Sequence, residues 1–277
     1  MEIIGQRKLL NNIDNLIENN TFPRFSIIQG VEGSGKRLIS AYIAKKLNAT
    51  YVPCELGIDA VRDVINLSYE QVSPIVYVWA DAHKMSINAK NAVLKVTEEP
   101  PQTAYFIMTT DNINNILDTL ISRGTVFNIS PYSKAELSSY IESRLPNIDS
   151  DTKGIIVDIS ITPKNIIDMS RIDIAKMQKT VNVLCDSVGK VNLANILKIP
   201  TFLAFKDDDK DKFDPILFMR ACLFRYAQLF RETKNRKYNK LVSLTSTYLC
   251  DMYSKSLNKL STIDCWLIDS HSVMAVK

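Results

Sequence analysis

Gly30-Val31-Glu32-Gly33-Ser34-Gly35-Lys36-Arg37 is the stretch that decides how this chain folds. An apolar run at 25–28 precedes it, and apolar residues at helical spacing follow it from Leu38. A strand, a glycine-rich loop and a helix in this order predict a phosphate-binding loop, because the glycines let backbone N–H groups converge on a phosphate at a helix N-terminus. The residues that we predict to form this nucleotide-binding loop are Gly30, Gly33, Ser34, Gly35 and Lys36.

Arg37 departs from the pattern of such loops. The lysine is ordinarily followed by Ser or Thr, whose hydroxyl ligates Mg²⁺, and a guanidinium cannot do so. The strand predicted at 75–79 should end in two acids, one for the metal and one for the attacking water, but it ends in Ala80-Asp81. These two changes predict no metal site and no ATPase activity of the chain alone. ATP as a bound cofactor and no cofactor at all remain alternatives.

The composition is that of a globular protein of two or three domains, with 277 residues and 46% hydrophobic content. The formal net charge of +4 permits nucleic-acid or acidic partners without demanding them. The five cysteines are widely spaced and form no C-x-x-C pair, which predicts no zinc and a reducing compartment. We find no signal-peptide core and no apolar run of about 18 residues. We therefore predict a cytoplasmic protein with no membrane partner.

Strand and helix patterns alternate as far as about residue 130. The strands are predicted at 25–28, 50–53, 75–79, 104–108 and 126–129, and the helices between them include 58–64 and 87–97. Such alternation predicts a parallel sheet with helices on both faces. After Pro131 the patterns are helical. We therefore predict a phosphate-loop domain at 1–130, a small helical lid at 131–190 and a helical collar at 191–277.

Two charged segments of the helical region are predicted to be solvated. Residues 206–212 form a charge run typical of an exposed loop. The basic residues between 220 and 240 could contact a phosphate backbone, but no aromatic side chains alternate with them in the part after 231. A solvated helix end is the favoured interpretation.

Polar residues near the predicted strand ends are further candidates for the site. Arg123 precedes the last strand, so it is expected at the domain edge, where an arginine that reaches a neighbouring subunit's nucleotide is worth about 10³–10⁵ in rate. Thr109 or Thr110 could reach a γ-phosphate or only cap its strand. His83 is favoured as a structural hydrogen bonder rather than a catalyst.

Together these elements resemble the clamp-loader branch of the AAA+ ATPases. The resemblance is firm over about 1–130 and topological beyond. Besides the phosphate loop, it rests on Ile4-Gly5-Gln6 before a helix, on Asn91–Pro101, which is close to N-A-L-L-K-x-x-E-E-P-P, and on Ile121-Ser122-Arg123, which matches the S-R-C arginine-finger motif. Many relatives carry a four-cysteine zinc module before the acidic strand. Only Cys54 lies in that interval here, so the resemblance implies no zinc.

The resemblance implies an AAA+ fold and a place in a five-subunit ring that loads a sliding clamp on primed DNA. The implied partners are gamma/tau-type and delta-type subunits of a DNA polymerase III holoenzyme, together with the clamp and the DNA. Arg37 and Ala80 resemble the delta-prime type, a non-hydrolysing stator whose catalytic Arg123 would act in trans. The alternatives are an active gamma/tau-like motor and an AAA+-shaped scaffold with no nucleotide role.

Overall fold

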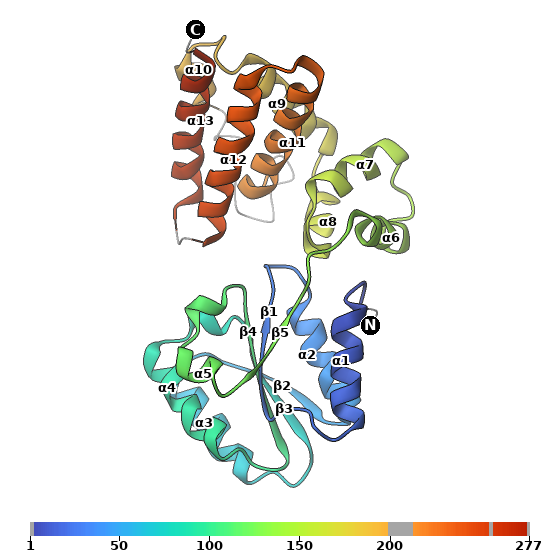
Figure 1. Ribbon diagram of the computed structural model, residues 1–277, viewed down its shortest axis with the longest axis vertical. Helices are drawn as coiled ribbons and strands as arrows, with labels where there is room; N and C mark the ends of the chain where they lie inside the picture. Colours follow the sequence, from blue (N-terminus) through green and yellow to red (C-terminus); the bar gives the residue numbers. More distant parts are fainter. Residues whose placement is uncertain (1–2, 199–212, 255–256, 276–277) are drawn as a thin grey trace. The chain divides into compact units, whose positions relative to one another are not determined.

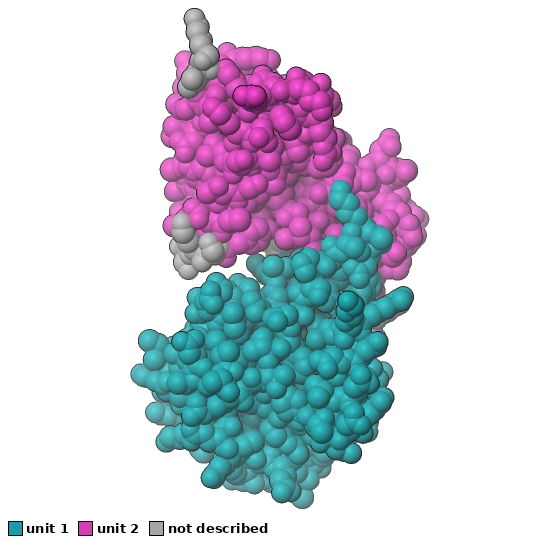
Figure 2. Space-filling view, in the orientation of Figure 1, with its two compact units in different colours: residues 1–136, 162–164 teal, residues 137–161, 165–277 magenta. Residues whose placement is uncertain are grey.

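The computed structural model describes residues 3–198, 213–254 and 257–275. The chain forms two compact units, which Figure 2 distinguishes by colour. Unit 1 comprises Met1–Glu136 and Thr162–Lys164, and unit 2 comprises Leu137–Ile161 and Asn165–Lys277. The division at residues 130 and 190 stays a prediction. The loop predicted at 206–212 lies outside the described residues.

Unit 1 is built on a parallel five-stranded sheet in the order β2-β3-β4-β1-β5 (Figure 1). The strands are β1 (Phe25–Gln29), β2 (Thr50–Cys54), β3 (Ile75–Trp79), β4 (Ala104–Thr110) and β5 (Thr125–Asn128). The five predicted strands are thereby confirmed, as is the α/β fold class of an AAA+ phosphate-loop domain followed by a helical region. Because parallel strands end at the same edge of a sheet, the residues after β1, β3 and β4 come together there.

Helices cover both faces of this sheet. On one face lie α1 (Arg7–Glu18) and α2 (Lys36–Lys46), and on the other lie α3 (Ile58–Tyr69), α4 (Ile87–Glu98) and the short α5 (Asp118–Ile121) (Figure 1). Ile28 and Val78 point to the first face, where they pack with Ile39 of α2. The inner strands β1, β3 and β4 are buried on both faces, which is why they appear in the sequence as largely apolar runs, whereas the edge strands β2 and β5 are partly exposed.

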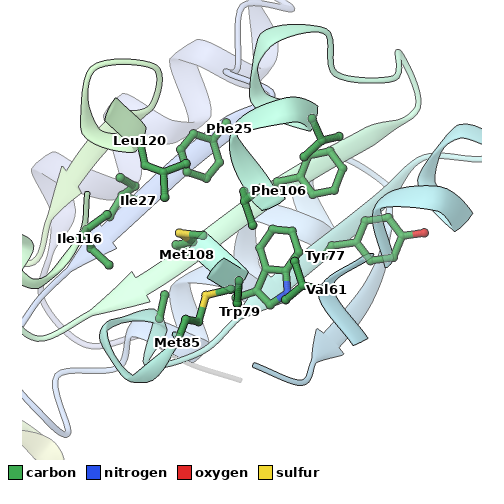
Figure 3. Packing of buried hydrophobic residues seen from close by; sticks show 14 of the residues in the cluster. Phe25, Ile27, Val61, Tyr77, Trp79, Met85, Phe106, Met108, Ile116 and Leu120 are labelled. Atoms are coloured by element: carbon green, nitrogen blue, oxygen red, sulfur yellow. The ribbon is translucent and has the colours of Figure 1, made fainter. Parts of the chain in front are cut away.

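The larger of the two cores of unit 1 is aromatic at its centre (Figure 3). The Phe106 ring of β4 stacks on Trp79 of β3 at a centroid distance of 5.7 Å and on Tyr77 at 5.6 Å. Trp79 and Phe106 are completely buried. The three helices on this face contribute one buried side chain each to the same core, which are Val61 from α3, Val93 from α4 and Leu120 from α5. These rings therefore join the middle of the sheet to three helices.

Only helices follow β5 among the described residues. They are α6 (Lys134–Arg144), α7 (Ser150–Ile159), α8 (Pro163–Met169), α9 (Ile174–Ser187), α10 (Leu193–Ile196), α11 (Pro215–Thr233), α12 (Arg236–Ser254) and α13 (Lys259–Ala275). Helix α11 contacts α7, α9, α12 and α13, as its nearly all-round apolar pattern predicts. The Asp214 carboxylate caps this helix by accepting from the backbone N–H groups of Ile216 and Leu217.

The prediction of a solvated basic helix end is wrong for two arginines of α11. The Arg220 side chain is half-buried and donates to the carbonyl of Ile159 on α7. Arg225 pairs with Asp186 on α9 at 3.1 Å. Both arginines therefore tie α11 to its neighbours.

None of the described helices is long and apolar enough to cross a membrane.

Candidate functional site

The glycine-rich loop lies between β1 and α2, at the edge of the sheet where the strands end. Gly33 and Gly35 have φ angles of +78° and +91°, a region that side chains strongly disfavour. The loop is tied to the neighbouring strand because Gly30 N–H donates to the Thr110 carbonyl at 3.1 Å. The Tyr132 hydroxyl donates to the Ser34 carbonyl at 2.8 Å. The structure therefore brings together the residues predicted for the phosphate loop.

Lys36 is turned inward onto the loop. Its ammonium donates to the carbonyls of Gly30 at 2.7 Å and Val31 at 3.1 Å, and the residue is only 8% exposed. Burial lowers the pKa of Lys36, and the nearby carboxylates of Asp111 and Asp81 oppose that effect. A phosphate at this position would have to compete with the two carbonyls for the ammonium.

Arg37 occupies the place where a metal ligand is expected. Its guanidinium lies 3.3 Å from the carboxylate of Asp81, the acid that follows β3 by two residues. The Lys84 ammonium lies 3.6 Å from the same carboxylate oxygen. Two exposed cations thus lie against the remaining acid, whose place is that of the acid for the attacking water, and Ala80 supplies no acid for the metal. The residues do not fit a Mg²⁺ site, whereas the loop itself retains the backbone and the lysine that a phosphate needs.

The two threonines after the apolar run of β4 are both buried. The Thr109 hydroxyl accepts from Asp81 N–H at 3.0 Å, and the Thr110 hydroxyl bonds to the backbone of Asn112. Two roles were open for these threonines, contact with a γ-phosphate or capping of the strand end, and these contacts match the strand-end cap. The Nδ1 of His83 lies 3.2 Å from the Asp111 carboxylate but makes no hydrogen bond, so the structural role of His83 stays a prediction.

The start of α8 belongs to unit 1 and lies against the loop. A Cβ placed on Gly33 would come within 2.4 Å of the Lys164 Cβ and 2.9 Å of the Thr162 hydroxyl. The Lys164 ammonium pairs with the carboxylate of Glu32, a residue of the loop. Sequence reasoning missed this pair, because nothing in the spacing of Glu32 and Lys164 indicates it.

Arg123 lies in the turn between α5 and β5. Its guanidinium donates to the Glu98 carboxylate at 3.0 Å and to the Thr119 carbonyl at 2.9 Å. The side chain keeps 37% of its surface exposed, in agreement with the edge position expected for it. Because each of these bonds uses one N–H of the guanidinium, other donors remain for an anion.

Gly124 fixes the turn that presents Arg123. A Cβ at this position would lie 2.9 Å from two ring atoms of Phe25, which is buried in the core. This close approach accounts for glycine where the S-R-C motif has cysteine. The turn packs on the first strand of the unit without a side chain between them.

Gly124→Ala is therefore expected to lower the free energy of unfolding by about 1–3 kcal/mol, because the added methyl group overpacks a buried site. Chemical denaturation measures this loss. Gly154→Ala in α7 is the matched control, since a Cβ there meets nothing within 4 Å. Replacing a glycine inside a helix in open space should instead stabilise by about 0.5–1 kcal/mol. Equal effects of the two changes would contradict the steric argument.

Metal-ligating side chains are dispersed in the part of the chain that the structure describes. No group of three or more His, Cys, Asp or Glu side chains is placed there to hold a metal ion. Cys54 is half-buried at the end of β2, and burial raises the pKa of its thiol to about 11.

Comparison with known proteins finds similar sequences among the subunits of DNA polymerase III. The family model for the DNA polymerase III delta subunit matches residues 57–133, which include α4 and Arg123. The DNA polymerase III subunit gamma of Buchnera aphidicola subsp. Schizaphis graminum is 28% identical over 192 residues, which are 57% of this chain and 53% of that protein. The chain is similar to clamp-loader subunits. It spans about half the length of the curated relatives that it matches first.

Two solved structures of proteins from Thermotoga maritima share this fold. The Thermotoga maritima RuvB Holliday junction branch migration motor has a TM-score of 0.53 at 17% identity, covering 82% of this chain and 78% of that one. A DNA polymerase III gamma subunit-related protein of Thermotoga maritima has a TM-score of 0.51 at 18% identity, covering 96% of this chain and 99% of that one. The likeness extends from the phosphate-loop sheet into the helical region.

Proposed function

We propose that this chain is a clamp-loader subunit of the delta-prime type. In this role it hydrolyses no ATP itself and lends Arg123 to the nucleotide site of a neighbouring motor subunit. Its proposed partners are gamma/tau-type and delta-type subunits, with the sliding clamp and primed DNA as the substrate of the whole complex. The coarser assignment, a clamp-loader-type AAA+ chain, rests on the family match and the relatives.

The ion pair between Arg37 and Asp81 carries the proposal of a non-hydrolysing subunit. Hydrolysis by phosphate-loop enzymes needs Mg²⁺ to bridge the phosphates and neutralise the developing charge. The metal-binding acid is replaced by Ala80, and a guanidinium on the remaining carboxylate opposes the entry of a dication, because like charges would then share one small volume. ATP binding without turnover and no bound nucleotide both remain compatible with this role.

The exposed guanidinium of Arg123 supports the second half of the proposal. An arginine contributed in trans stabilises the charge that spreads over the transferred phosphoryl group in the transition state. Unit 1 presents this side chain at a turn rather than over its own phosphate loop, since Arg123 bonds to Glu98 and Thr119. Its target would therefore be a nucleotide held by another subunit.

A second candidate is an active motor subunit of the gamma/tau type. The observation in its favour is the nature of the relatives, which include gamma and tau subunits. The experiment that separates the candidates replaces Lys36 and Arg123 by alanine one at a time. It measures clamp- and DNA-stimulated ATP turnover of a complex rebuilt from this chain and the partner subunits of the same organism. If the chain is a motor, the Lys36 change should lower ATP turnover. If it is a stator, the Arg123 change should lower turnover, and if it is a scaffold, neither change should.

The charge of Arg37 also gives a prediction for nucleotide binding. We expect Mg²⁺ to change the affinity of the wild-type chain for ATP by less than about twofold. In an Arg37→Thr, Ala80→Asp double variant we expect Mg²⁺ to tighten binding roughly tenfold, equivalent to about 1.4 kcal/mol, because the hydroxyl and the acid at position 80 restore metal ligands. Titration calorimetry with Mg²⁺ or with EDTA measures both affinities. A wild-type chain that binds ATP only with Mg²⁺ would contradict the prediction.

A further inference from the structure

We infer that Glu98 is a positioning residue for Arg123. Its carboxylate holds the guanidinium in one orientation at the edge of unit 1, ready for an anion from a neighbouring subunit. The inference rests on the proposed function, since Arg123 needs positioning only if it acts on a partner's nucleotide. Glu98 is the first of the two acids in the E-E-P-P segment, and the sequence alone indicates no role for it.

Two acceptors from different elements hold the guanidinium. Arg123 Nη2 donates to Glu98 Oε1 at 3.0 Å, and Nη1 donates to the carbonyl of Thr119 on α5 at 2.9 Å. Bonds from two nitrogens of one planar group fix the direction of the plane as well as its position. A single contact would leave the long side chain free to rotate about it.

The helix that carries Glu98 is itself anchored to the rest of unit 1. It is the last residue of α4, and Lys90 on the same helix donates to the carbonyl of Asn115, just before α5, at 2.7 Å. Lys90 is 7% exposed, and burial lowers its pKa. At a rise of 1.5 Å per residue the two side chains lie about 12 Å apart along the helix. Val93 and Val96 are buried between them and pack in the core that also holds Leu120 of α5.

The pair is too exposed to be important for folding. Glu98 retains 58% and Arg123 37% of the side-chain surface, and exposed ion pairs contribute little to stability. Their effect on a reaction can be much larger, because a displacement of 1 Å in a catalytic group can cost on the order of 100-fold in rate. Loss of Glu98 should therefore change the rate and leave the stability of the chain nearly unchanged.

Glu99 provides a matched control. It is exposed, carries the same charge and is the next residue in the chain. Its backbone carbonyl, rather than its carboxylate, accepts a hydrogen bond from Tyr69. Removing the Glu99 carboxylate thus reproduces the change in net charge of a Glu98 variant without touching the guanidinium of Arg123.

The test compares the rebuilt complex containing wild-type chain with Glu98→Ala, Glu98→Gln, Glu99→Ala, Arg123→Ala and the Glu98→Ala, Arg123→Ala double variant. The kcat and KM for ATP are measured separately under clamp and DNA stimulation. We expect Glu98→Ala to lower kcat about tenfold and to leave KM nearly unchanged. This is the pattern expected when the lost interaction is made only in the transition state. Glu98→Gln should recover most of the rate, because the amide oxygen can accept the same hydrogen bond.

The control and the double variant decide how Glu98 acts. Glu99→Ala should behave as wild type, and Glu98→Ala should add nothing to Arg123→Ala, because residues that act through one another are not additive. An unchanged or increased rate in Glu98→Ala, or a further loss in the double variant, overturns the inference. If Arg123→Ala slows turnover and Glu98→Ala does not, only the role of Glu98 fails. If Arg123→Ala has no effect, the proposed function fails with it.

Discussion

Arg123→Ala is expected to lower the stimulated ATP turnover of the rebuilt complex by about 10³-fold, the lower end of what a trans arginine contributes. Lys36→Ala in the same chain should leave turnover close to the wild-type rate. The contrast follows from where the two cations point. Lys36 is bonded to its own loop carbonyls, whereas Arg123 is exposed at a turn.

Arg123→Lys tests whether charge alone is sufficient. A lysine keeps the positive charge but lacks the planar fork that bonds a phosphoryl group through two nitrogens. We expect this variant to lose most of the rate that alanine loses. Recovery of the full rate by lysine would mean that Arg123 acts as a distant charge and not as a ligand of the transferred group.

Assembly must be measured alongside turnover. Arg123 donates hydrogen bonds to Glu98 and Thr119, and both of these residues belong to unit 1, as Arg123 does. An exposed pair contributes about 0.2–1 kcal/mol, so the alanine variant should fold and enter the complex like wild type. Thermal unfolding of the chain and gel filtration of the complex check both points. A variant that no longer assembles would place Arg123 in the subunit interface rather than at the partner's phosphates.

The middle of the sheet of unit 1 could be predicted because β1, β3 and β4 are buried on both faces. Each strand is then a short apolar run, and a run of this kind between helical patterns has few other interpretations. The ends were less predictable. Strand β4 continues to Thr110 because Thr109 and Thr110 pair with Ile28 and Gln29 of β1. That pairing depends on the strand order, which no periodicity in the sequence contains.

The candidate site was predictable only where its residues are neighbours in sequence. The loop from Gly30 to Lys36 is one local motif whose residues act together. Arg37 and Asp81 are 44 residues apart, and Glu98 and Arg123 are 25 apart. The sequence shows that Arg37 cannot ligate a metal. That its guanidinium contacts the acid that follows β3 is evident only from the fold, which brings β1 and β3 to either side of β4.

Phe106→Ala is expected to lower the free energy of unfolding of unit 1 by about 3–5 kcal/mol, since it removes a buried ring and leaves a cavity. A typical domain is stable by only about 5–15 kcal/mol, so this single change should remove a large part of the total. The ring is completely buried, and its stacking on Trp79 and Tyr77 adds to the loss.

The two tryptophans allow unit 1 to be followed alone. Trp79 lies in unit 1 and Trp266 in unit 2, so a Trp266→Phe background leaves Trp79 as the only indole. Urea unfolding followed by its fluorescence then reports the stability of the sheet around Phe106. Val72→Ala serves as control, because Val72 is 92% exposed and surface changes stay within about 0.5 kcal/mol.

The Phe106 result also bears on the candidate site. Strand β4 carries Phe106 in its middle and, at its end, Thr109, which accepts from the backbone of Asp81. If the core fixes the strand end, partial loosening of β4 should weaken the hold on Asp81 and with it the pair to Arg37. A loss below about 1 kcal/mol in Phe106→Ala, far less than a buried aromatic ring costs elsewhere, would contradict this account. It would mean that the helices α3, α4 and α5 close over the cavity and hold the sheet without the ring.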